Sequence, residues 1–170
     1  GQSNQFSGAI GIGSFAGNSF QGTNSIGIGI GAGSYTQGQV AISIGQQAGQ
    51  SNQSSGSIAI GYQAGNLDQS GNSIAIGYQA GYSYQNINAV AIGYQAGQEQ
   101  NKNSIAIGYQ AGQTSGGTAA IAIGYQSGQD TQGDNSISIG TNAGQNTQQD
   151  SSIAIGNLAG RNNQGLTSIA

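Results

Sequence analysis

Residues 72–81 read Asn-Ser-Ile-Ala-Ile-Gly-Tyr-Gln-Ala-Gly, and variants of this phrase recur along the whole chain. The glycine that closes the Ile-x-Ile-Gly part stands at positions 13, 29, 45, 61, 77, 93, 108, 124, 140 and 156. The period is therefore sixteen residues, with one slip to fifteen. A fixed period of this kind is typical of one small structural unit that stacks on its neighbours. The sequence predicts an all-β parallel β-solenoid, or β-roll, of about 10.6 coils, built as one repeat array over residues 1–170.

The Ile phrase itself predicts a β-strand, because its large and small residues alternate with period two. Ile or Val stands three residues and one residue before the closing glycine in all ten units. We expect this column to form the core ladder of the solenoid. Its central members are Ile58, Ile60, Ile74, Ile76, Ile105, Ile107, Ile121 and Ile123.

The other face of the same strand carries only Gly, Ala or Ser at all twenty positions. An ordinary solvent-exposed face would tolerate larger polar residues, so this restriction indicates that something packs closely on this face too. Two isoleucines per coil are also a small core for sixteen ordered residues, which favours burial of the second face against another copy. The expected packing residues are Ser57, Ala59, Ser73, Ala75, Ser104 and Ala106.

Three further columns follow the closing glycine. Tyrosine comes next in five consecutive units, as Tyr62, Tyr78, Tyr94, Tyr109 and Tyr125, and glutamine columns stand two and eight places after the glycine. Identical side chains at the strand spacing pair with themselves, so we expect stacked rings and amide ladders. Turn glycines stand four places after the closing glycine, among them Gly65, Gly81, Gly97, Gly112, Gly128 and Gly144. The segment Tyr-Gln-Ala-Gly-Gln is predicted to be a second short strand on the opposite side of the coil.

The composition excludes most kinds of chemistry. The chain has 170 residues and no Pro, Cys, Met, Trp or His, and its net charge is −3 with only two basic residues. It therefore has no basic patch for nucleic acid, no usual zinc site and no Cys or His catalysis, and no apolar run approaches the roughly 20 residues of a membrane span. Five scattered acids do not supply the Asp that every calcium-binding β-roll repeat needs. We expect no enzyme, cofactor or metal, and interpret the acids as solvated loop residues that build no site.

The phrases at residues 72–77 and 103–108 resemble the head repeats of YadA-like trimeric autotransporter adhesins. Comparable repeats occur in phage and giant-virus fibre proteins. The resemblance covers about six residues of each unit and recurs along the chain. It implies a parallel β-roll, trimeric, displayed outside a cell or virion and used for adhesion. A weaker similarity is to bacterial ice-nucleation proteins, but their Thr-x-Thr columns are missing here, which makes ice binding a minor alternative.

The favoured functional hypothesis is a non-enzymatic structural fibre outside the cell, at a cell surface or at a virion surface. An adhesin or receptor-binding head is the alternative. The expected partners are further copies of the chain, in a homo-oligomer or a head-to-tail filament, together with a glycan or host-surface ligand for the adhesin. Gly1 has the phase of Gly17, and Ile169-Ala170 begin another phrase, so the array is expected to be uncapped at both ends and part of a longer chain or fibre.

Overall fold

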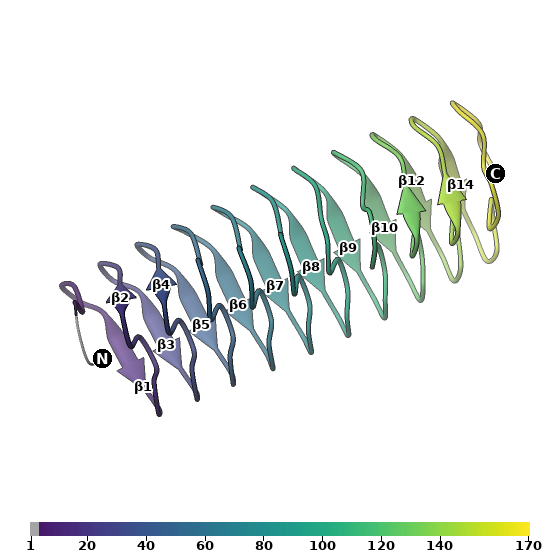
Figure 1. The fold of residues 1–170 in the computed structure, drawn as a ribbon. Helices are drawn as coiled ribbons and strands as arrows, with labels where there is room; N and C mark the ends of the chain where they lie inside the picture. Colours follow the sequence, from purple (N-terminus) through teal and green to yellow (C-terminus); the bar gives the residue numbers. More distant parts are fainter. Residues whose placement is uncertain (1–3) are drawn as a thin grey trace.

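The computed structural model describes residues 4–170, which form a single row of stacked coils with β1 and β14 at opposite ends (Figure 1). The architecture is the predicted parallel β-solenoid. It makes about 9 turns of ~16 residues, slightly fewer than the 10.6 coils that length and period suggested. Among the described residues, no helix is long and apolar enough to span a membrane.

The Ile phrases form one ten-stranded parallel sheet along the stack. Each strand pairs with the strand of the next coil in constant register, as when Ile58 faces Ile74 and Ala59 faces Ala75. The fifteen-residue unit keeps this register, with Val90 opposite Ile105. The strands are β1 (Ile10–Ile12), β3 (Ile26–Ile28), β5 (Ile42–Ile44), β6 (Ile58–Ile60), β7 (Ile74–Ile76), β8 (Val90–Ile92), β9 (Ile105–Ile107), β10 (Ile121–Ile123), β12 (Ile137–Ile139) and β14 (Ile153–Ile155).

The opposite side of the coil is a ladder of very short strands and isolated parallel bridges. The short strands are β2 (Phe20–Gln21), β4 (Thr36–Gln37), β11 (Thr131–Gln132) and β13 (Thr147–Gln148). They contain the glutamine eight places after the closing glycine. The predicted second strand, Tyr-Gln-Ala-Gly-Gln, is wrong, because its first four residues are the turn that leads to the observed short strands.

Left-handed backbone explains why this segment turns. In the coil that follows β7, Gly77 has φ +128°, Gln79 has φ +51° and Gly81 has φ +53°. Three positive φ values within five residues reverse the chain and cannot continue a strand. A Cβ on Gly77 would also lie 2.4 Å from the carbonyl oxygen of Gly93, so this position needs glycine for close stacking as well.

The interior of the coil is lined by the small face of the Ile strand, which corrects the expectation that Ile forms the core. Ala59 and Ala75 of the sheet pack against Ala48 and Ala64 of the turns in a buried cluster. The two walls of one coil thus cover the small face, which corrects the expectation that this face packs against another copy. Because opposing alanines are already in contact, an Ile pointing inward would have no room. The predicted packing residues Ser57, Ala59, Ser73, Ala75, Ser104 and Ala106 are all buried.

Candidate functional site

The Ile ladder lies on the outer surface of the solenoid. Along the strands the isoleucines are half-buried while the residue between them is buried, a pattern that repeats from β6 to β10. This applies to the predicted core residues Ile58, Ile60, Ile74, Ile76, Ile105, Ile107, Ile121 and Ile123. The side chains of one chain therefore leave a continuous apolar stripe of β-branched residues partly open to solvent.

The tyrosine column stands beside this stripe, just after the closing glycines. Its five rings stack with centroids 5.0–5.2 Å apart and interplanar angles of 6–15°. The rings are 39–49% exposed. The three inner rings thus stack on both faces and leave an edge to solvent, and stacking at the strand spacing favours a regular, stiff column.

Two outer amide ladders follow the tyrosines. In the first, Gln79 Nε2 donates to Gln63 Oε1 at 2.9 Å. The same bond joins each pair of successive glutamines in this column, from Gln47 at one end to Gln126 at the other. In the second, three places further along each coil, Gln129 Nε2 donates to Gln113 Oε1 at 3.2 Å. Arg161 continues this second ladder, because its Nε donates to Gln145 Oε1 at 2.9 Å. These half-buried amides rigidify the turns.

A third amide ladder fills the interior. Gln69 Nε2 donates to the carbonyl oxygen of Ile58, across the same coil, at 2.8 Å, and to Gln85 Oε1 of the next coil at 3.1 Å. Gln100 belongs to this ladder, since its Oε1 accepts from Gln85 Nε2 at 3.3 Å. Gln100 was not assigned to this column from the sequence, because the fifteen-residue unit places it seven residues after its closing glycine.

The interior ladder lacks one rung, at Gly116. Parallel bridges pair Gly116 with Gln100 on one side and with Gln132 on the other, so glycine occupies the glutamine position here. The turn glycine of this coil confirms the gap. A Cβ on Gly112 would meet only Ala106 and Ala122, at 3.2 and 3.4 Å, whereas the equivalent atom on Gly128 would meet Gln132 at 2.9 Å.

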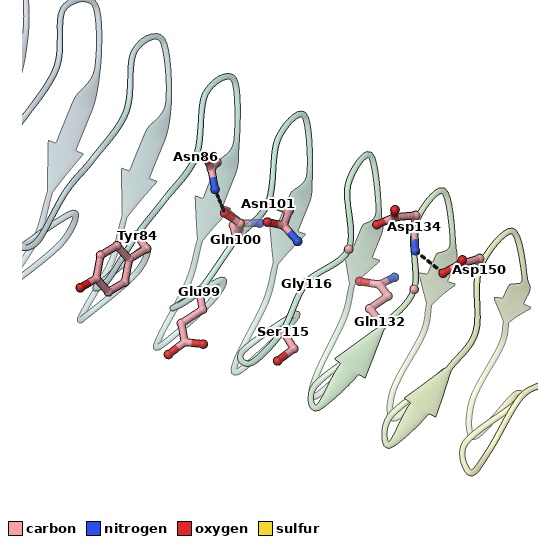
Figure 2. Close-up of a pocket in the computed structure, with 12 residues that line it drawn as sticks. Tyr84, Asn86, Glu99, Gln100, Asn101, Ser115, Gly116, Gln132, Asp134 and Asp150 are labelled. Atoms are coloured by element: carbon pink, nitrogen blue, oxygen red, sulfur yellow. Dashed lines mark hydrogen bonds between the residues drawn. The ribbon is translucent and has the colours of Figure 1, made fainter.

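A groove of about 630 Å³ opens on the side of the solenoid at the missing rung (Figure 2). Its lining includes Glu99, Asp134 and Asp150, with the glycines 116, 117 and 133 between them. Asp134 and Asp150 are stacked, because the backbone N–H of Asp134 donates to Asp150 Oδ1 at 2.9 Å. The two acids thus share a column, although the five acids were interpreted from the sequence as scattered loop residues, and their separation of sixteen residues was the signal.

The groups that these surfaces expose are aliphatic, phenolic, amide and carboxylate side chains. Within residues 4–170, no three His, Cys, Asp or Glu side chains group closely enough to hold a metal ion. The interior amide N–H groups donate to structural hydrogen bonds, as those of Gln69 and Gln132 do. What the molecule offers a ligand or partner is an apolar stripe, a row of phenol edges and one acidic groove.

Short stacked coils, joined by parallel strand pairing and carrying columns of like side chains on their outer surface, define the chain as a β-solenoid repeat protein. Within it, the family model of the YadA head domain repeat matches residues 100–112 and 131–144. The chain thus contains two YadA head domain repeats, as the resemblance of the Ile phrases had indicated. Each matched segment runs through one Ile strand, β9 or β12, to a turn glycine. Comparison with curated proteins and with solved structures gave no match.

Proposed function

We propose that this chain is the adhesin-like head of a surface-displayed, non-enzymatic protein, and that it self-associates through its Ile ladder. The observation that carries the proposal is the presence of two YadA head domain repeats within an uninterrupted solenoid. YadA head domains are surface-exposed parts of outer-membrane adhesins, which supports an extracellular location. The resemblance to adhesin heads also supports a trimer as the assembled form.

The apolar stripe supports self-association. Soluble monomers rarely expose long contiguous apolar patches, and here the patch follows ten stacked strands. A second copy is the partner that fits, because its ladder has the same spacing and can interdigitate along the whole stripe. The Tyr column borders this interface and would lie at its edge.

Sedimentation velocity of the purified chain tests this proposal. We expect the parent to form a defined oligomer and the double variant Ile76→Lys/Ile107→Lys to sediment as a monomer with unchanged circular dichroism. The lysines point outward, so folding is preserved while two charges would be desolvated in the interface. The matched control Thr36→Lys/Thr131→Lys adds the same charge at exposed positions of the opposite ladder and should associate like the parent. A parent that stays monomeric at every concentration would contradict the proposal.

A structural fibre is the second candidate, and the constant register of the stack favours it. Backbone bonds such as Ile58 N–H to Ser73 O and Ile74 N–H to Ala89 O, each 2.9 Å, recur from coil to coil along the axis. The same ladder can therefore continue lengthwise without distortion. Electron micrographs of the sedimentation samples distinguish the two, because filaments of variable length support the fibre and short particles of fixed length support the head.

A further inference from the structure

We propose that the groove at the missing rung binds an extended basic segment of a partner protein, which carries two or more Lys or Arg side chains. This inference deepens the adhesin hypothesis by naming a partner chemistry. It depends on that hypothesis only because the groove must be exposed at the surface for a partner to reach it. Three features of the groove support this inference: an amide oxygen of Gln132 that faces the groove, three carboxylates outside ion pairs, and the spread of these groups along the solenoid axis.

The buried amide is Gln132, which is only 3% exposed and lines the groove. Its Nε2 donates to the carbonyl oxygen of Ile121 at 2.7 Å and to Gln148 Oε1 at 3.4 Å. Its Oε1 would accept from the preceding glutamine of the ladder, but Gly116 stands there and has no side chain. Figure 2 shows this oxygen turned toward Gly116. This oxygen faces the groove without a donor from the described part of the chain, so a ligand that brings an N–H group can bond to it.

The carboxylates add acceptors to the same groove. Asp134 Oδ1 accepts the backbone N–H of Thr118 at 2.7 Å, and Asp150 Oδ1 accepts that of Asp134, which leaves the second oxygen of each for a ligand. Glu99 lies on the other side of the missing rung (Figure 2). The described part of the chain places no ion pair on these three groups. The basic residue nearest to them along the stack is Lys102. It occupies the same position of its coil as Thr118 and Asp134 do in theirs, and its coil lies two before that of Asp134. The groove is thus rich in acceptors and net negative.

The spread of these groups favours an elongated ligand over a metal ion. From Tyr84 to Asp150 the lining covers five successive coils, or about 19 Å at the usual strand spacing. An extended peptide of about six residues has this length. Tyr84, at one end, is 66% exposed and offers a ring face to a guanidinium group. A basic peptide is favoured over an amino sugar because carboxylates outnumber aromatic platforms by three to one.

The test is fluorescence anisotropy with the labelled peptide Gly-Arg-Gly-Arg-Gly-Arg at low salt, with its Gly-Glu counterpart as the reversed-charge probe. We expect saturable binding of the basic peptide alone. The isosteric double variant Glu99→Gln/Asp134→Asn should weaken binding about tenfold, since two ion pairs are lost. The control Asp130→Asn removes an exposed charge from the coil that also contains Asp134, but outside the groove. It should change the affinity by less than about twofold.

A second variant, Gly116→Gln, tests the groove without removing charge. Gly116 does not have left-handed backbone, and a Cβ there would lie 3.6 Å from the nearest atom, the carbonyl oxygen of Glu99. Glutamine should therefore restore the rung, raise the unfolding temperature and abolish peptide binding. Three results would overturn the proposal: equal loss in Asp130→Asn, unchanged binding in Gly116→Gln, or binding of a labelled glucosamine hexamer in place of the peptide. Sedimentation of the same samples reports self-association separately, so this inference and the proposed function fail independently.

Discussion

Val40 shows how strictly the coil geometry constrains single residues. It has φ +51°, in a column where Asn24, Asn72, Asn88 and Asn135 have φ 55–58°. Asparagine enters the left-handed region readily, whereas a β-branched side chain there is a true outlier. Val40 is also 57% exposed, so packing of its side chain offsets little of the backbone strain. The repeat thus demands a backbone conformation at this position and tolerates poorly suited residues there, since the β-branched Thr167 has φ +50° in the same column.

Replacing this valine should stabilise the protein. We expect Val40→Asn to raise the free energy of unfolding by about 1 kcal/mol, because the strain of a β-branched residue in the left-handed region is relieved. Urea denaturation followed by circular dichroism measures it. The reverse change Asn135→Val, at an exposed position of the same column, should cost a similar amount. Equal stability of all three proteins would show that the stack relaxes around this residue.

At the scale of the repeated elements, the amide ladders differ in direction and in burial. The interior ladder donates toward the C-terminal end, as from Gln69 to Gln85, whereas the outer ladder donates toward the N-terminal end, as from Gln79 to Gln63. Their aligned amide dipoles therefore oppose each other along the stack. Loss of a hydrogen bond should destabilise the protein more in the buried interior ladder, because water can replace a lost partner only in the outer ladder.

Leucine substitutions should reveal this difference. Gln69→Leu leaves Gln85 Oε1 without its donor in a dry interior and removes one hydrogen bond each from the carbonyl oxygen of Ile58 and from Gln53 Nε2, which still donates to the carbonyl oxygen of Ile42. We expect a loss of about 3 kcal/mol. Gln79→Leu in the outer ladder should cost less than about 1 kcal/mol. Leu158 already occupies the equivalent turn position with φ +62°, so backbone strain does not confound the control. Equal losses on thermal unfolding would contradict the assignment of the buried ladder as a main determinant of stability.

The sequence predicted the elements better than their orientation. The sixteen-residue period, the strand at residues 58–60 and the solenoid follow from it because stacking requires like residues at like positions. Alternation defines two faces of a strand but does not tell which one points inward. The apolar side chain of Ile favoured the prediction that the Ile face forms the core. The width of the coil decides otherwise, since Ala59 already touches the opposite wall. The groove was missed because the shortened unit displaced Gln100 from its column, which hid the gap at Gly116, and because the sixteen-residue separation of Asp134 and Asp150 was overlooked.

For the whole molecule, stability should be the sum of coil and interface contributions. Each coil contacts only the coils before and after it, as the pairing of consecutive Ile strands shows. Such one-dimensional arrays behave as chains of nearest-neighbour units. Removal of one complete unit therefore shortens the molecule without changing the environment of the coils that remain.

Deletion of residues 62–77 tests this directly, because it joins Gly61 to Tyr78 and keeps every column in phase. We expect a folded protein with unchanged strand signal per residue and a lower unfolding temperature, since one interface is lost. Deletion of residues 62–69 removes half a unit and joins Gly61 to Ser70, which places polar loop residues where the turn and its buried alanine belong. That protein should lose its strand signal in this region and unfold with reduced cooperativity. Circular dichroism and hydrogen exchange measure both effects. If the half-unit deletion were as stable as the full-unit deletion, the phase of the columns would not be what holds the coils together.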